Sequence, residues 1–267
     1  MPSGRRRLRS LRPASRLRRV LLRSERAYRL SRRGYLLARY VARRPHEPDF
    51  AAFAALAGRT GSFLDIGANA GQSALSFRLY DKRTPILSIE ANPYHAADLR
   101  FVKRIVRGFD YRLVAAGETD GSVTLHVPTY RGIPITGEAS VHLDHAARSW
   151  WMSEHLGTAD HDRFAVSEQR VALRWLDALR LHPASVKIDV EGFELPVLRG
   201  LTETFERHRP AVMVERNPRT GDVAAHLEGL GYRAFVFDAR AGRFTPYREQ
   251  AAQNLFFFAD GGPPAAA

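Results

Sequence analysis

The sequence contains no cysteine among its 267 residues. This absence excludes disulfide bonds, thiolate zinc sites, iron–sulfur clusters and a cysteine nucleophile. It also fits a reducing compartment, so we expect a cytoplasmic protein. Long apolar runs are missing too. A membrane-spanning helix needs about 18 or more apolar residues in succession, so we expect none here.

Acidic residues are nearly missing from the N-terminal part of the chain. Residues 1–44 contain 16 arginines and a single acid, Glu25, which gives this segment a net charge of +15. The whole chain carries +13, so the other 223 residues sum to −2. The body of the protein is therefore close to neutral, which argues against a basic nucleic-acid-binding surface across it.

Apolar residues recur between these arginines at roughly helical spacing. One interpretation is an amphipathic helix on an anionic membrane, and another is an arm that grips nucleic-acid phosphates. The composition is also typical of an organelle transit peptide, whereas the apolar run at 20–22 is too short for a secretory signal. The simplest alternative is a solvated extension whose second half packs one helix on the body.

Composition divides the chain into three parts. We expect an arginine-rich N-terminal arm with helical character over residues 1–48, because prolines end it before the body begins. One folded domain is expected over 49–260. The Gly-, Pro- and Ala-rich tail at 261–267 is expected to be disordered. The sequence gives no basis for predicting an oligomeric state.

Short apolar runs alternate with helical stretches along the body. This order predicts an α/β fold, with a mostly parallel sheet covered by helices on both faces. The stretch 128–170 is irregular and contains Trp150 and Trp151, which is typical of a lid or binding loop. The expected strands are 62–66, 86–90, 111–115, 123–127, 186–190, 212–215, 232–237 and 255–258, and the expected helices are 71–80, 94–107, 194–207 and 220–230.

The segment 63–71 contains a strand, a glycine-bearing turn and the start of a helix. Its small residues would let the backbone approach a ligand closely, and a helix N-terminus offers free N–H groups. Asp65 would repel a pyrophosphate but would suit the ammonium group of S-adenosylmethionine. The alternative is that Asp65 only caps the helix. The candidate cofactor-binding residues of this turn are Asp65, Gly67, Ala68, Asn69 and Gly71.

Glu90 ends the second expected strand, 25 residues after Asp65. In doubly wound folds an acid at about this distance accepts hydrogen bonds from ribose hydroxyls. Asn92 and Pro93 follow and would shape the wall around the adenosine. The alternative is that Glu90 is a surface charge.

The segment 187–194 is the second informative stretch. Strand alternation places Lys187, Asp189 and Glu191 on one side, at the sheet edge where ligands bind. Asp189 and Glu191 are therefore candidate catalytic residues, as a base or as metal ligands. A purely structural ion pair with Lys187 is the alternative, because charges on an apolar strand need partners.

Further groups around this edge have weaker support. Glu215 and Asn217 end the next strand and, with the preceding acids, could offer oxygen ligands to Mg²⁺; alternatively, Glu215 only orders a loop or pairs with an arginine. We therefore keep Mg²⁺ as a hypothesis and assign no metal-ligating residues. His142 is a candidate base for a substrate hydroxyl, and His145 is an alternative.

Taken together, the motifs FLDIGANAG at 63–71, IEANP at 89–93 and VKIDVEGFELPVLRG at 186–200 resemble the FkbM family of S-adenosylmethionine-dependent methyltransferases. This resemblance covers about residues 60–260. It implies a Rossmann-like class I methyltransferase fold, with a seven-stranded, mostly parallel sheet whose last strand is antiparallel. It also implies methylation of a hydroxyl on a sugar or natural-product small molecule. By the resemblance, Asp189 and Glu191 lie at the active site, and the cofactor contacts are Asp65, Gly67, Asn69, Gly71 and Glu90.

Three rival functions differ in what they require. A cytosine C5 methyltransferase needs a cysteine, and an amino-adenine enzyme carries Asn/Asp-Pro-Pro-Tyr where this chain has Asp-Val-Glu-Gly at 189–192. We therefore expect no nucleic-acid partner. A nicotinamide-dependent dehydrogenase would carry Gly-x-Gly-x-x-Gly, which the turn at 67–71 lacks. The third rival, a non-catalytic scaffold that keeps the fold, stays open.

Overall fold

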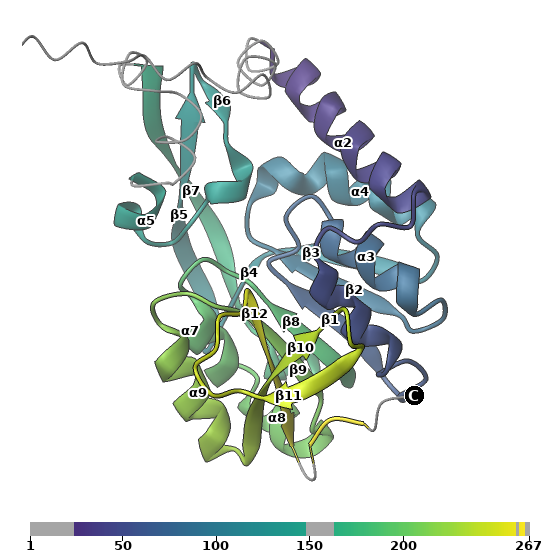
Figure 1. Ribbon diagram of the computed structural model, residues 1–267. Coiled ribbons are helices and arrows are strands. Elements are labelled where there is room, and N and C mark those ends of the chain that lie inside the picture. The colour runs from purple at the N-terminus through teal and green to yellow at the C-terminus, as the bar shows by residue number, and fades with distance from the viewer. Residues whose placement is uncertain (1–23, 148–162, 260–261, 265–267) are drawn as a thin grey trace, which may run out of the picture.

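The computed structural model describes residues 24–147, 163–259 and 262–264. Eight of its strands are β1 Ser62–Ile66, β2 Ile86–Glu90, β3 Phe109–Leu113, β8 Pro183–Ile188, β9 Ala211–Glu215, β10 Tyr232–Asp238, β11 Arg243–Pro246 and β12 Asn254–Ala259. They form one sheet in the order β11-β10-β12-β9-β8-β1-β2-β3 (Figure 1). The strands from β3 to β9 in this order pair in parallel, as predicted.

The half of the sheet formed by β12, β10 and β11 agrees with the prediction in strand direction and differs from it in strand number. The last strand, β12, is antiparallel to both β9 and β10, as the family resemblance implies. The expected count of seven strands is wrong, because β11 pairs with the outer edge of β10 and adds an eighth. This addition lies at the opposite edge from β3 and leaves the centre of the sheet unchanged.

Helices cover both faces of the sheet (Figure 1). On one face, the 3-10 helix η1 (Pro48–Ala54), α3 (Gln72–Tyr80) and α4 (Ala96–Ile105) pack around buried phenylalanines. On the other face lie α7 (Glu194–Arg199), α8 (Thr202–His208) and α9 (Thr220–Gly229). Phe63 and Leu64 show the alternation of β1, because these neighbours belong to the two different cores.

The single helix predicted over 194–207 is wrong, because α7 and α8 are separate helices that meet at Gly200. A Cβ atom at Gly200 would lie 1.9 Å from the carbonyl oxygen of Gly117, so the backbones touch there. Asp177 then caps α8 by accepting the N–H groups of Glu203 and Thr204 at 2.9 Å. A neighbouring segment therefore interrupts the helix, which the local sequence pattern could not indicate.

A second, four-stranded sheet includes both ends of the stretch 128–170, which the sequence predicts to be irregular. It has the order β4-β7-β5-β6, formed by β4 (Ala115–Gly117), β5 (Gly121–Tyr130), β6 (Ile133–Pro134) and β7 (Phe164–Trp175). The strand expected at 123–127 belongs to β5 and not to the main sheet, and the strand expected at 111–115 divides between β3 and β4. Trp150 and Trp151 lie outside the described residues.

From Ser24 onward, the basic segment is a docked helix, α2 (Glu25–Val41). The guanidinium groups of Arg32 and Arg33 bind the buried carboxylate of Asp98 on α4, and Arg33 does so at 2.6 Å. This agrees with the simplest interpretation of the segment, a helix packed on the body. The divisions at 48 and 260 stay predictions. Over the described ranges, no helix is long and apolar enough to cross a membrane.

Candidate active site

A pocket with about 690 Å³ of empty space, part of it open solvent, lies at the carboxyl ends of β1, β2 and β8. This is where ligands bind in open parallel sheets. The second sheet and the chain after β6 form its other side. Its lining residues include Ile66, Gly67, Asn69, Ile89, Glu90, Ala91, His95, Leu125, Thr136, Gly137, Ser140, Val141, Asp189, Val190, Glu191 and Phe193.

The turn after β1 needs glycine for a steric reason. Gly67 has a φ of +81°, and a Cβ atom there would lie 1.7 Å from the carbonyl oxygen of Asp189. The turn and the end of β8 can therefore approach only because position 67 has no side chain. Gly71 serves packing instead, because its Cβ would lie 2.8 Å from Cγ2 of Val102. Gly67 and Asp189 line the cavity, whereas Gly71 and Val102 do not.

Glu90 holds the turn from the neighbouring strand. Its carboxylate oxygens accept the backbone N–H groups of Asn69 at 2.6 Å and of Asn92 at 2.7 Å. Glu90 is buried at the cavity wall, so the alternative of a surface charge is wrong. A carboxylate has about four acceptor positions. Glu90 therefore retains acceptor positions that a ligand's hydroxyl groups can use.

Asn92 and Ala68 are buried and do not line the cavity. The side chain of Asn92 accepts the N–H of Tyr94, which caps the short helix at 93–95. The N–H of Ala68 donates to the carbonyl of Ile89 at 3.2 Å. Both residues shape the turn beneath the cavity. The sequence predicted that they contact the cofactor, but neither side chain lines the cavity.

Asp65 lies beneath the cavity and is fully buried. The register of the sheet places it between Ser88 on β2 and Lys187 on β8. Ser88 donates to Oδ2 of Asp65 at 2.8 Å, and Nζ of Lys187 lies 3.7 Å from Oδ1. Burial raises the pKa of Asp65, although Lys187 opposes that shift. This placement does not fit the predicted direct contact between Asp65 and a ligand's ammonium group, and helix capping does not describe it either.

Lys187 is a buried cation that joins β1 to the end of β8. Its ammonium group donates to the carbonyl of Gly67 at 2.9 Å and to Oδ2 of Asp189 at 3.0 Å. Burial alone would lower the pKa of Lys187, but the carboxylates of Asp189 and Asp65 raise it above the ordinary value. The ion pair between Lys187 and Asp189, which the sequence analysis gave as an alternative, is therefore present. It also orients Asp189, which lines the cavity.

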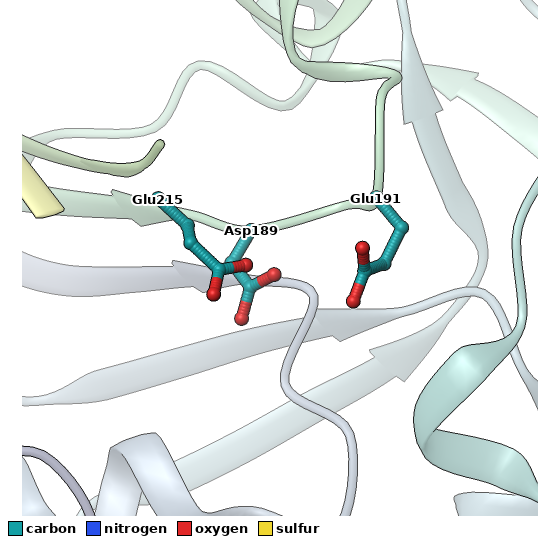
Figure 2. A group of neighbouring side chains, drawn as sticks. All are labelled: Asp189, Glu191 and Glu215. Atoms are coloured by element: carbon teal, nitrogen blue, oxygen red, sulfur yellow. The ribbon is translucent and has the colours of Figure 1, made fainter. Parts of the chain in front are cut away.

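Three carboxyl groups meet at the ends of β8 and β9. One carboxylate oxygen from each of Asp189, Glu191 and Glu215 lies within 4.8 Å of the other two (Figure 2). Burial alone would raise the pKa of Asp189, but Lys187 and a hydrogen bond with Glu215 keep it below its ordinary value. Burial and the neighbouring carboxylates of Asp189 and Glu191 raise the pKa of Glu215 to about 9. At neutral pH, Asp189 is therefore ionised while Glu215 holds a proton.

These carboxyl groups offer the oxygen ligands that Mg²⁺ prefers, so the donor chemistry fits that ion. Asn217 does not join them. Its side-chain oxygen accepts the N–H of Arg219 at 2.8 Å, and its own N–H donates to Thr220. The structure therefore brings Glu215 to the cluster, as the sequence suggested, and leaves Asn217 in a separate turn.

His142 lies behind the loop that carries Glu191. One nitrogen of its ring lies 3.2 Å from the carbonyl oxygen of Gly192, and the backbone N–H of His142 donates to Oγ of Ser140. It does not line the cavity. In this arrangement His142 supports the loop, and its predicted role as a base has no geometric support. The side chain of His145 lies outside the described residues.

The sequence did not point to the wall formed by His95, Thr136 and Ser140. Arg32 of α2 reaches this wall by donating to Oγ1 of Thr136. The same arginine binds Asp98. Burial alone would raise the pKa of Asp98, but His95, Arg32 and Arg33 lower it to about 2. A side chain of the basic segment therefore contacts a residue of the cavity.

Comparison with protein-family models identifies the family of this chain. The profile of the methyltransferase FkbM domain matches residues 65–234, more than half of the chain. The strand order, and a glycine turn at the carboxyl edge of the parallel strands, are typical of doubly wound α/β proteins. Within that class, this chain belongs to the FkbM family of S-adenosylmethionine-dependent methyltransferases.

The solved structures that the chain matches are distant in sequence. An FkbM methyltransferase from Methylobacillus flagellatus is 16% identical with a TM-score of 0.45, and the match covers 74% of this chain and 43% of that one. A TehB-like S-adenosylmethionine-dependent methyltransferase from Corynebacterium glutamicum is 9% identical with a TM-score of 0.42, covering 88% and 97%. A precorrin-6Y C5,15-methyltransferase from Geobacter metallireducens is 13% identical with a TM-score of 0.39, covering 78% and 83%. No curated protein matches the sequence.

Proposed function

We propose that this protein transfers the methyl group of S-adenosylmethionine to a hydroxyl oxygen of a sugar or natural-product small molecule. The observation that carries the proposal is the charge of the cavity wall. Glu90, Asp189 and Glu191 line it, and its described lining contains no lysine or arginine. Such a wall favours a cationic ligand and disfavours phosphate groups. This supports a sulfonium cofactor and speaks against both nicotinamide dinucleotides and nucleic-acid backbones.

Within this proposal, the cofactor occupies the side of the cavity next to the turn. Glu90 accepts hydrogen bonds from the ribose hydroxyls, while Gly67 and Asn69 allow close approach of the backbone. The apolar side chains of Ile66 and Ile89 lie next to these polar groups in the cavity lining. When bound, S-adenosylmethionine supplies an electrophilic methyl group on a positively charged sulfur. The protein's own contribution is alignment of the acceptor and removal of its proton.

Asp189 is the proposed proton acceptor. It lines the cavity, and Lys187 keeps it ionised at neutral pH. A hydroxyl oxygen becomes much more acidic as it bonds to a methyl group, so a weakly basic carboxylate suffices to take its proton. Glu191 lines the same part of the cavity and is proposed to orient the acceptor. Mg²⁺ bound by this cluster would also orient the acceptor, by holding its hydroxyl oxygen.

The test is turnover by the purified full chain. Formation of S-adenosylhomocysteine is followed with a panel of sugars and hydroxylated natural products, with and without Mg²⁺. Asp189→Asn is expected to lower the rate by about a hundredfold or more while cofactor binding is kept. Asp110→Asn removes an exposed carboxylate of β3 and serves as the matched control.

The outcomes separate the proposal from its rivals. Full activity of Asp189→Asn with normal cofactor binding would exclude Asp189 as the proton acceptor. Methylation of transfer RNA or duplex DNA in preference to the small acceptors would favour the nucleic-acid alternative. Cofactor binding without turnover on any acceptor would favour the non-catalytic scaffold.

A further inference from the structure

Helix α2 exposes an apolar stripe on the side that faces away from the body. Leu30 is 64% exposed, Leu37 is 39% exposed and Val41 is 74% exposed. Their spacing of seven and four residues places them on one face of the helix, with Gly34 between them. In Figure 1, α2 lies at the outer edge of the molecule, beside α4. The stripe is therefore open to an external partner.

The opposite face of α2 explains why this stripe is unusual. Leu36 and Tyr40 pack against the core, and Arg32 and Arg33 bind Asp98. A surface helix that buries one face normally presents polar residues on the other. The body does not repeat this feature. Four of the nine exposed large apolar residues among the described ones belong to α2, and the others are scattered.

Arginines stand at both ends of the stripe. Arg26 is exposed at its start, and Arg43 and Arg44 are exposed just after its end. The positive charge of the chain is concentrated in residues 1–44, and the remainder sums to −2. An apolar stripe between cationic ends matches a surface that has an apolar layer beneath anionic groups.

We propose that the outer face of α2 binds the surface of an anionic lipid bilayer. Leu30, Leu37 and Val41 enter the boundary of the acyl chains, and the flanking arginines contact the lipid phosphates. The helix lies on the bilayer rather than crossing it, in keeping with its 17 residues. The ion pairs of Arg32 and Arg33 with Asp98 transmit this attachment to the folded domain.

Two other occupants fit the observations less well. Nucleic-acid phosphates would use the arginines but would give no reason for an exposed row of leucine and valine. A second copy of the chain would bring two strongly basic segments together, which like-charge repulsion opposes. The bilayer alone accounts for both the stripe and the charge.

The experiment is flotation of the full chain with vesicles of phosphatidylcholine that contain phosphatidylserine, compared with vesicles of phosphatidylcholine alone. The protein is expected to float with the anionic vesicles only. Leu30→Glu/Leu37→Glu is expected to weaken this binding by about tenfold or more. Ile105→Glu/Leu113→Glu makes the same charge change at two exposed apolar residues of the body and is expected to bind like the parent.

Circular dichroism and binding of S-adenosylhomocysteine check that both variants fold. Absence of flotation with anionic vesicles would overturn the proposal, and so would equal binding by the two double variants. Tight binding to duplex DNA, unchanged in Leu30→Glu/Leu37→Glu and without vesicle binding, would assign the arm to nucleic acid instead. A dimer that becomes a monomer in that variant, without vesicle binding, would assign the stripe to a second copy.

Discussion

The ammonium group of Lys187, on β8, lies 3.0 Å from the carboxylate of Asp189, the residue that directly follows this strand. The same ammonium group also approaches the buried Asp65 at 3.7 Å. One cation thus compensates a carboxylate beneath the cavity and a carboxylate that lines it. Stability and chemistry at this site depend on the same side chain.

Lys187→Met should therefore destabilise the protein strongly. Removing one partner of a buried ion pair leaves uncompensated charge and typically costs about 3–5 kcal/mol in the free energy of unfolding. Urea denaturation measures this loss. Lys103→Met is the control, because Lys103 pairs with Asp110 in solvent at 2.6 Å and an exposed pair contributes about 1 kcal/mol or less. Equal losses for the two variants would show that Lys187 has no special structural role.

Gly67→Ala tests the contact between the turn and β8. The added Cβ atom would meet the backbone of Asp189, which cannot rotate away. Gly58→Ala is a close control, because Gly58 has nearly the same φ, +82°, but no atom within 4 Å of its added Cβ. We expect Gly58→Ala to cost about 1–2 kcal/mol from backbone strain alone. Gly67→Ala should cost at least about 2 kcal/mol more, or prevent folding.

Thermal unfolding and titration with S-adenosylhomocysteine measure both effects of these glycine variants. Gly67→Ala is also expected to lose cofactor binding, whereas Gly58→Ala keeps it. Similar stability and binding for the two would mean that the end of β8 moves aside easily, which would contradict the close approach described above.

Arg32 and Arg33 allow a test of whether α2 positions the cavity wall. Both bind Asp98 and both side chains are largely buried, but only Arg32 also contacts Thr136. Arg32→Ala and Arg33→Ala should therefore lose similar amounts of stability. Only Arg32→Ala should weaken binding of S-adenosylhomocysteine, by about fivefold. Equal effects on binding would show that the contact with Thr136 does not matter to the cofactor.

Glu215 predicts a pH dependence of stability. Its pKa is raised to about 9 in the folded protein, from an ordinary value of 4.5. Between these values the folded state holds a proton that the unfolded state releases, so the free energy of unfolding falls as the pH rises. Glu215→Gln should remove this decline between about pH 5 and pH 9. Glu203→Gln, at an exposed position on α8, should leave it unchanged.

Urea denaturation at several pH values measures this difference between the variants. The same decline in Glu215→Gln and in the parent would show that Glu215 ionises normally. Mg²⁺ offers a second check, because an ion bound to the cluster must displace the proton of Glu215. Its binding should therefore tighten as the pH rises and should release protons to the buffer.

The sequence predicted the part of the site that depends on strand ends. Glu90 and Asp189 could be placed because parallel strands end at the same edge of a sheet, so apolar runs followed by acids mark that edge. The position of Asp65 was misjudged, because the strand pattern alone does not reveal its neighbours. Its burial follows from the register that sets it between Ser88 and Lys187.

The rest of the cavity depends on contacts between distant segments. Strand β7 pairs with β5 along its length, and Thr136 and Ser140 reach the cavity from the segment between these strands. The local pattern of 164–175 has no strict alternation, and its partner lies far back in the chain. The contact between Arg32 and Thr136 spans 104 residues and has no signature in either segment.

The proposed function requires that the acidic cavity binds S-adenosylmethionine through Glu90. Calorimetric titration of the full chain with S-adenosylhomocysteine tests it most directly, with nicotinamide adenine dinucleotide as the competing ligand and Glu90→Gln as the variant. We expect micromolar binding of S-adenosylhomocysteine, a loss of about tenfold or more in Glu90→Gln, and no binding of the dinucleotide. A correctly folded protein that binds no S-adenosylhomocysteine, or binds the dinucleotide equally well, would show that the cavity is not a site for S-adenosylmethionine.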